Sequence, residues 1–257
     1  MENKKLGFIG GGRITRIILQ AFRNKNLDFD SICVYDPDTE VSGKLKEDFP
    51  NVKIEGSNKI PAQQGMVFLA VHPPVIMDTL KEIGNVVREE AVIVSLAPKI
   101  TIEKIMSLVH SRKIIRMIPN ATSYINEGYN PVYFSESFNK KEKKQLKKLF
   151  RSLGKTIEVE ENELEPYAIV SAMLPTYFWF QWKKMEDIAV KTGFSEKKSR
   201  QIIKSTLRRS LKLYFNTGLS PEEVIDLIPV KPIGDKEKEI ETILESKLLG
   251  LHEKIRP

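Results

Sequence analysis

The first 160 residues alternate short apolar runs with stretches in which apolar residues recur at helical spacing. The apolar runs have the length and composition of strands, and the expected strands are 5–9, 31–36, 51–54, 65–71, 91–97, 113–119, 129–135 and 155–160. The expected helices are 14–24, 37–49, 75–87, 101–109 and 139–152. Such alternation is typical of a mostly parallel sheet with helices on both faces.

The pattern changes near residue 160, after which strand-like runs no longer occur. The segments 163–193, 195–218 and 220–228 carry apolar residues at helical spacing. Gly193 and Gly218 stand where helix C-caps belong, and each is soon followed by a serine that can start the next helix. We therefore expect an α/β domain over residues 1–160 and an all-α domain over 161–257.

A glycine-rich stretch, "GFIGGGRI" (7–14), joins the first expected strand to the first expected helix. Gly10, Gly12 and Thr15 occupy the three positions of the G-x-G-x-x-G/A fingerprint, with threonine where a small residue is usual. Glycines let a pyrophosphate approach the backbone, and the free amides of the following helix favour its negative charge. The stretch predicts a Rossmann-type dinucleotide site.

The choice between NAD and NADP depends on Asp36 and Arg13. Asp36 ends the second expected strand, where a carboxylate binds the adenosine ribose and disfavours a 2′-phosphate. It could instead cap the next helix. Arg13 could pair with a phosphate, or it could be an exposed residue of the first helical turn. Both cofactors stay open.

Composition narrows the class of protein. The chain has 257 residues and a net charge of +7, much of it in the basic segments 139–148 and 195–212. Apolar residues interrupt both segments, so we interpret them as solvated helix faces rather than a nucleic-acid site. The single cysteine, Cys33, excludes an intrachain disulfide, and three scattered histidines predict no metal site. We expect no membrane span, no signal peptide and a cytoplasmic location.

Several segments together resemble the pyrroline-5-carboxylate reductases. They are "GFIGGGRI", "VFLAVHPP", "VIVSLAPKIT" and "IIRMIPNATSYINEG", in the order and spacing of that family. In the second half, "LEPYAIVSAMLPTYFWF" and "GLSPEEVIDLIPVKPIGD" match more poorly. The resemblance implies a Rossmann domain followed by a helical domain that interlocks with its partner in a homodimer. It also implies hydride transfer from a reduced nicotinamide to a cyclic C=N bond.

On the cofactor side, the resemblance carries over at most positions. Val71 and Pro73 match, with His72 in place of a lysine; Ser95 and Ala97 match; and Arg116, Pro119 and Asn120 match an element that lies by the nicotinamide in the family. The residues expected to bind NADP or NAD are Gly10, Gly12, Arg13, Ile14, Asp36, Val71, His72, Pro73, Ala97 and Asn120.

The substrate side departs from the family pattern. Ser171 matches, but Met173 and Leu174 replace a serine and a glycine, and Asp235 stands where the family has a threonine hydroxyl. The expected catalytic residues are Ser171, Thr176 and Asp235. Lys99 stands in place of a glycine, and it and Lys183 are either replacement anion-binding groups or ordinary exposed lysines.

Two functions follow from this pattern. The first is an NAD(P)H-dependent reductase of small imines, with pyrroline-5-carboxylate the leading substrate. The second is a cofactor-binding dimer that has lost catalysis and serves as a sensor or partner protein, since the cofactor half is intact and the substrate loops are altered. A nucleic-acid binder ranks last, because charge alone suggests it.

Overall fold

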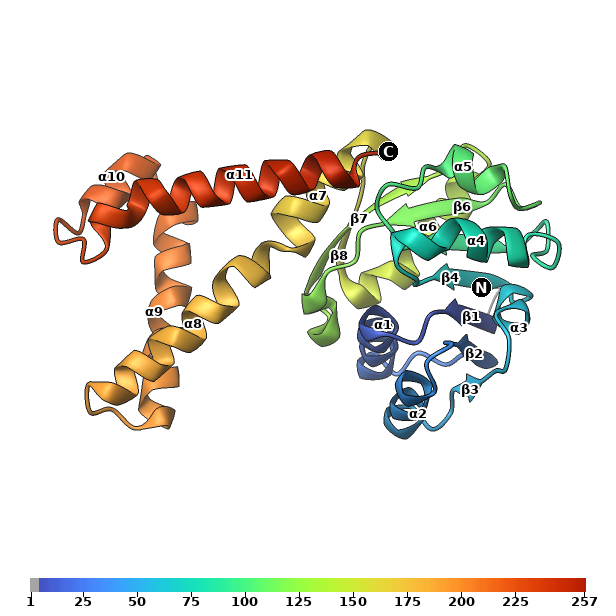
Figure 1. The fold of residues 1–257 in the computed structure, drawn as a ribbon, viewed down its shortest axis with the longest axis horizontal. Helices are drawn as coiled ribbons and strands as arrows, with labels where there is room; N and C mark the ends of the chain where they lie inside the picture. The colour runs from blue at the N-terminus through green and yellow to red at the C-terminus, as the bar shows by residue number, and fades with distance from the viewer. Residues whose placement is uncertain (1–4) are drawn as a thin grey trace. The chain divides into compact units, whose positions relative to one another are not determined.

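The computed structural model of the protein describes residues 5–257 and divides into two compact units (Figure 1). The first unit runs to Ala172 and includes Leu251–Pro257; the second is Met173–Gly250. The division thus falls later than the expected boundary at residue 160. The reason is that Leu164, Ala168 and Ile169 are buried and extend the core of the first unit.

The first unit contains an eight-stranded sheet in the order β3-β2-β1-β4-β5-β6-β7-β8. The strands are β1 Lys5–Ile9, β2 Ser31–Tyr35, β3 Lys53–Ile54, β4 Met66–Leu69, β5 Val92–Ser95, β6 Ile114–Met117, β7 Gly128–Phe134 and β8 Gly154–Glu158. All pairs are parallel except β6 with β7. The expected strands and the mostly parallel sheet are confirmed.

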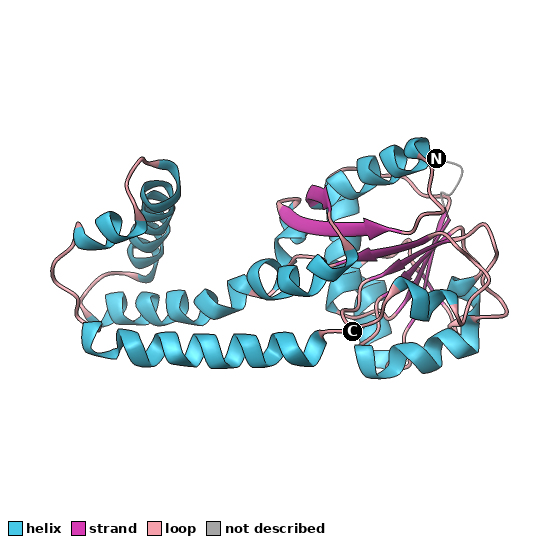
Figure 2. Ribbon diagram, turned by 90° about the horizontal axis from the view of Figure 1, so that it is seen from above, coloured by secondary structure: helices cyan, strands magenta, loops and turns pink. Residues whose placement is uncertain are grey.

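Helices cover both faces of this sheet (Figure 2). They are α1 Arg13–Asn24, α2 Thr39–Asp48, α3 Lys59–Ala62, α4 Pro73–Ile83, α5 Ile102–Met106, α6 Lys140–Phe150 and α7 Leu164–Tyr167. Alternate residues of a strand point to opposite faces. Phe68 accordingly joins the core under α1, α2 and α6, whereas its neighbour Val67 joins the core under α3, α4 and α5.

The second unit is helical, as expected. It comprises α8 Leu174–Lys191, α9 Glu196–Asn216 and α10 Pro221–Asp226, followed by α11 Glu237–Ile255, whose last turn belongs to the first unit. Ser195 and Ser220 cap α9 and α10 through their side chains, as the sequence predicts. The expected helix 163–193 is interrupted by a π-helical turn, Ala168–Ala172. Helix α11 was not expected.

Candidate cofactor and substrate site

The loop between β1 and α1 has the geometry that its glycines predict. Gly10 has φ +101°, and a Cβ there would lie 2.5 Å from the carbonyl oxygen of Ala70, so only glycine fits beside the end of β4. Gly12 is the N-cap of α1 and has no side-chain cap. A Cβ on Gly12 would meet no described atom within 4 Å. The open space above the first amides of α1 is where a pyrophosphate would lie.

Thr15 fits the third position of the fingerprint because its hydroxyl has a partner. The side chain is fully buried, and Oγ1 donates a 2.6 Å hydrogen bond to the carbonyl oxygen of Gly10. This bond ties the first turn of α1 to the glycine loop. A larger residue is therefore accommodated without an unpaired buried hydroxyl.

Asp36 follows β2 and holds the glycine loop from the other side. Its Oδ2 accepts a 2.7 Å hydrogen bond from the amide of Gly11, and its Oδ1 accepts from the amide of Asp38 at 2.9 Å. The N-cap of α2 is Asp38, which accepts from two amides of the first turn. Asp36 is thus not the helix cap, and its role at an adenosine ribose stays a prediction.

Arg13 and Ile14 begin α1 and point to different environments. Arg13 is exposed, and its guanidinium makes no hydrogen bond or ion pair with the residues from 5 to 257. Ile14 is partly buried and packs against the core on its side of the sheet. Arg13 is therefore free to meet a phosphate, whereas the side chain of Ile14 contributes packing.

The loop after β4 lies at the same end of the strands as the glycine loop, because β1 and β4 are parallel neighbours. His72 is the exposed N-cap of α4, and Pro73 occupies the first helical turn. Val71 packs against the second core. Strand order reverses between β1 and β4, and the crevice at such a switch point is the usual ligand site of an open α/β sheet.

Arg116 of β6 is buried rather than open to a ligand, and its side chain is 1% exposed. Its Nη2 lies 2.5 Å from Oε1 of Glu165, and its Nη1 lies 3.1 Å from Oε1 of Glu161. The same carboxylates accept from backbone amides: Glu165 from Lys99 at 2.9 Å, and Glu161 from Ile102 at 2.7 Å. The network fixes the β5–α5 loop, which carries the buried Ala97.

Glu161 and Glu165 were missed in the sequence. A signal existed, because an arginine inside an apolar strand needs acidic partners when buried. The sequence does not say which of the 34 acidic residues provide them.

Asn120 and Ser171, predicted for different roles, lie in contact. Nδ2 of Asn120 donates to the carbonyl oxygen of Ser171 at 3.0 Å, and the Ser171 hydroxyl donates to the carbonyl oxygen of Tyr129 at 3.2 Å. Oδ1 of Asn120 also accepts from the amide of Thr122 and caps a 3-10 turn. Asn120, in the loop after β6, therefore fixes the position of Ser171 in the π-helical turn.

Thr176 and Asp235 both belong to the helical unit but lie in different parts of it. The Thr176 hydroxyl donates to the carbonyl oxygen of Met173 at the start of α8. Asp235 is exposed in the 3-10 turn before α11 and makes no hydrogen bond or ion pair with the described residues. Figure 1 shows these two segments well apart. Within one chain they do not meet, and the catalytic roles of Ser171, Thr176 and Asp235 stay predictions.

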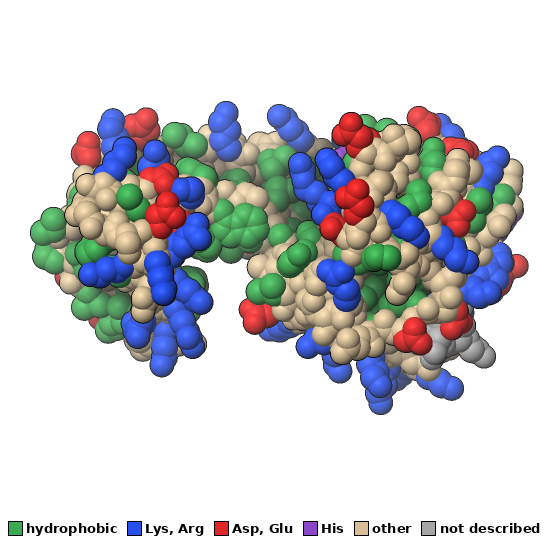
Figure 3. Space-filling view, turned by 90° about the horizontal axis from the view of Figure 1, so that it is seen from below, with side chains coloured by type: hydrophobic (Ala, Val, Ile, Leu, Met, Phe, Trp, Pro, Cys, Tyr) green, Lys and Arg blue, Asp and Glu red, His purple; other side chains and the backbone are tan. Residues whose placement is uncertain are grey.

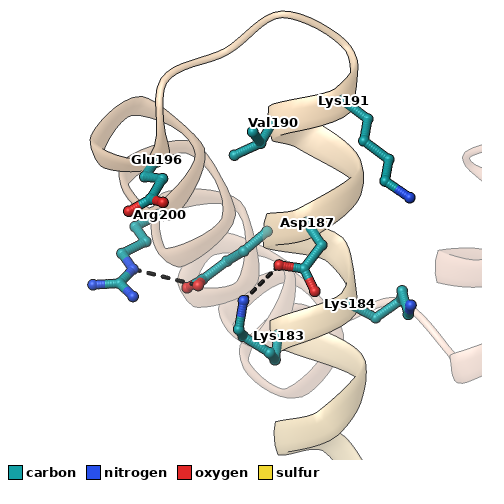
Figure 4. A pocket seen from close by; sticks show the side chains of 8 residues that line it. Lys183, Lys184, Asp187, Val190, Lys191, Glu196 and Arg200 are labelled. Atoms are coloured by element: carbon teal, nitrogen blue, oxygen red, sulfur yellow. Dashed lines mark hydrogen bonds and ion pairs between the residues drawn. The ribbon is translucent and has the colours of Figure 1, made fainter.

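A charged groove lies between α8 and α9 (Figure 4). In it Lys183 pairs with Asp187 at 2.5 Å, and Arg200 pairs with Glu186 at 3.3 Å. The hydrogen bond from Lys183 lowers the pKa of the Asp187 carboxyl, and the same bond raises the pKa of Lys183. Lys183 thus already has an acidic partner. This distinguishes it from Lys99.

Two negative findings concern residues 5–257. They include no group of three or more His, Cys, Asp or Glu side chains placed to hold a metal ion. They also include no helix that is long and apolar enough to cross a membrane.

Comparison with known proteins agrees with this geometry. Residues 5–99 match the family model described as "NADP oxidoreductase coenzyme F420-dependent". Pyrroline-5-carboxylate reductase of Escherichia coli is 26% identical over 227 residues, which cover 88% of this chain and 84% of the relative. The enzyme of Methanosarcina acetivorans is 22% identical over 255 residues, which cover 96% of this chain and 92% of the relative.

Solved structures share the fold. Plasmodium falciparum pyrroline carboxylate reductase with NADP bound has a TM-score of 0.83 at 22% identity, covering 100% of this chain and 98% of that one. The Streptococcus pyogenes 1-pyrroline-5-carboxylate reductase has a TM-score of 0.81 at 19% identity, with 98% of each chain covered. A Rossmann-type α/β domain followed by a helical domain is thus the architecture of both.

Proposed function

We propose that the chain is a divergent member of the pyrroline-5-carboxylate reductase family and an NAD(P)H-dependent reductase of a small cyclic imine, with pyrroline-5-carboxylate the leading substrate. The observation that carries the proposal is the intact glycine loop. Gly10 permits close contact with β4, Gly12 leaves space above the amides of α1, and the Asp36 carboxylate is held against the glycine loop by the amide of Gly11.

When bound, a reduced nicotinamide supplies the hydride for this reaction. The electrophilic carbon of a protonated C=N bond accepts it, and the ring nitrogen keeps its proton, so the product is a secondary amine. Little acid–base machinery is needed. The contribution of the protein is to place the two reactants in contact and to exclude water.

The residues divide between these tasks. Gly10, Gly12 and the first amides of α1 would bind the pyrophosphate, and Asp36 would bind the ribose. Val71, His72, Pro73 and Ala97 would line the crevice beyond, on the loops after β4 and β5. Asn120 would act by holding Ser171 in place. Residues 171–176 would contact the substrate.

We further propose a homodimer formed through the helical unit. Within Met173–Gly250, all of which the structure describes, no apolar side chain is buried. Apolar side chains lie open on its surface, interspersed with basic ones (Figure 3). Phe180 and Phe215 are 68% and 71% exposed. A second copy that covered these surfaces would bury them and would bring a second Asp235 to the assembly. The carboxylate would suit a cationic imine nitrogen.

We propose a cytoplasmic location. The single thiol, Cys33, is buried and unpaired, which suits a reducing compartment. The proposed reductase also consumes reduced nicotinamide cofactor, and the cytoplasm would supply it.

Steady-state oxidation of NADH and of NADPH tests the proposed function. Wild-type protein, mixed with pyrroline-5-carboxylate, should oxidise at least one of the two and produce proline. Thermal shift with each cofactor provides the binding control, because a ligand that binds only the folded state raises the melting temperature. Cofactor binding without turnover on any cyclic imine would rule out the reductase and leave a binding protein.

A further inference from the structure

Lys99 adopts a backbone conformation that lysine rarely adopts. Its φ is +75°, in the left-handed region. The other non-glycine residues with positive φ among those described are Asn26 and Asn126. Asparagine tolerates this region, whereas a lysine there is strained relative to glycine. Strained residues persist where the surroundings enforce them, and they cluster at ligand sites.

The surroundings that enforce this conformation are the buried Arg116 network. The amide of Lys99 donates to Oε1 of Glu165. Glu165 is buried, at 1% exposure, and is paired with Arg116. The backbone of the loop is therefore anchored from inside the fold. The Lys99 side chain itself is exposed. A cation on an anchored backbone is preorganised for a ligand.

Lys99 lies in the loop after β5, on the side of the glycine loop toward which the hydride-donating end of the cofactor would extend. Asp36 follows β2 and marks the ribose end, and the glycine loop after β1 marks the pyrophosphate. The other half of a dinucleotide must then extend across β4 toward β5. Strand β5, which leads to Lys99, is two strands from β1, or roughly 10 Å at ordinary strand spacing. The lysine side chain is long enough to reach a substrate held there.

Lys99 is also electrostatically available. It makes no ion pair with any residue from 5 to 257, whereas Lys183 is paired with Asp187. We propose that the Lys99 ammonium binds the carboxylate of the substrate and selects cyclic imines that carry one. This inference rests on the proposed reductase function and identifies the residue that binds the substrate carboxylate.

A lysine would replace binding that the altered segments no longer supply. Leu174 and Asp235 stand where the family has a glycine and a hydroxyl, and Asp235 would repel a carboxylate. The ammonium of Lys99 would attract the substrate carboxylate. The cationic iminium nitrogen would then be bound by a separate, negatively charged group. The two charges of the substrate would thus be recognised from separate elements.

The test compares two imines that differ only in the carboxylate, pyrroline-5-carboxylate and 1-pyrroline. The measured quantity is the ratio of their kcat/KM values in wild type, Lys99→Gln, Lys99→Arg and Lys99→Gly. We expect Lys99→Gln and Lys99→Gly to lower the ratio roughly tenfold to a hundredfold, the loss typical of a charge-assisted hydrogen bond. Lys99→Arg should retain most of the preference. KM for the cofactor should stay the same in all three.

Lys104→Gln is the matched control, because Lys104 is an exposed lysine on α5 without an ion-pair partner among the described residues. It should leave the ratio unchanged. A wild-type ratio near one, or a ratio that Lys99→Gln does not change, would overturn the role of Lys99 while leaving the reductase intact. Turnover of neither imine by wild type would instead overturn the proposed function and the role of Lys99 with it. Because glycine accepts positive φ, Lys99→Gly separates loss of charge from misfolding.

Discussion

The α/β unit and the helical unit treat their apolar side chains in opposite ways. In the α/β unit, β4, β5 and β6 are buried along their whole length, and two cores fill the space beneath the helices. In the helical unit, α8, α10 and α11 bury no residue and α9 buries only Ser199. The first unit has the core of an independent domain. The second has exposed apolar surface, which the proposed homodimer would cover.

The ion pairs of the two units also differ in burial. The α/β unit buries an arginine between two glutamates and anchors its loops on them, whereas the ion pairs of the helical unit are exposed to solvent. A buried pair contributes specificity only while both partners remain, since either one alone is an uncompensated charge. An exposed pair contributes little. The comparison therefore predicts where substitutions will cost most.

Arg116→Met should have the largest effect. It leaves Glu165 buried without its cation, and we expect a loss of about 3–5 kcal/mol in the free energy of unfolding. Arg200→Met removes the matching partner of Glu186 in the helical unit and should cost less than ~1 kcal/mol. Urea unfolding of both variants measures the difference. Equal losses would contradict the contrast between the two units.

A double variant, Phe180→Asp with Phe215→Asp, tests whether a second copy covers the helical unit. Desolvated aromatic anchors at an interface each contribute about 2 kcal/mol or more, so the dimer should dissociate at concentrations where wild type stays paired. Sedimentation velocity measures this. Ile60→Asp, at an exposed apolar position of the α/β unit, is the control and should leave association unchanged. A monomeric wild type would refute the dimer.

Gly12→Val separates cofactor binding from folding. Its Cβ meets no described atom within 4 Å, so the fold should tolerate the side chain, which would occupy the space of the pyrophosphate. We expect affinity for NADH or NADPH to fall at least about a hundredfold, or ~2.7 kcal/mol, in a fluorescence titration. Gly43→Val, at an equally open glycine of α2, should bind as wild type does. Unchanged affinity in Gly12→Val would place the cofactor elsewhere.

Replacing Glu142 should have the smallest effect on the free energy of unfolding, and that effect should depend on pH. The hydrogen bond from Lys113, followed by one from the backbone of Asn139, holds the pKa of Glu142 below its ordinary value. Because its pKa is lower in the folded than in the unfolded chain, the ionised Glu142 stabilises the fold at pH values above the unfolded pKa of about 4.3. This stabilisation is lost as the pH falls through the folded pKa.

Glu142→Gln should therefore cost about 1 kcal/mol or less at pH 7, and this cost should shrink as the pH falls below the unfolded pKa. Glu47→Gln, an exposed glutamate without an ion-pair partner among the described residues, should show no such pH dependence. Thermal unfolding across this pH range compares the two variants. A Glu142→Gln deficit that did not shrink at all with falling pH would show that the charge is not its source.

Local patterns predicted most of the α/β unit. The apolar runs became strands, and the glycines, Thr15 and Asp36 converge because one short loop and one strand end carry them. The Arg116 network was not predictable in this way, since its partners are 45 and 49 residues distant in sequence. The same network, together with the burial of Leu164, Ala168 and Ile169, keeps the residues after 160 with the first unit. A pattern within one segment does not reveal which distant segment covers it.

The helical unit was predicted less completely. Its serine caps were identified, because capping depends on a few adjacent residues. Helix α11 was missed, although Ile240, Ile243 and Leu244 recur at helical spacing. The altered substrate segments gave no basis for placing Thr176 and Asp235 relative to each other. Those positions depend on tertiary and quaternary contacts rather than on local sequence.

The most direct measurement of the central claim is deuterium transfer from cofactor to product. Wild-type protein is incubated with pyrroline-5-carboxylate and NADH or NADPH deuterated at C4 of the nicotinamide, in each of the two stereoisomers. We predict proline one mass unit heavier from one stereoisomer and unlabelled proline from the other, because a fixed cofactor presents one face to the imine. Proline without deuterium from both stereoisomers, or no proline at all, would contradict a reductase that binds its cofactor at Gly10–Gly12.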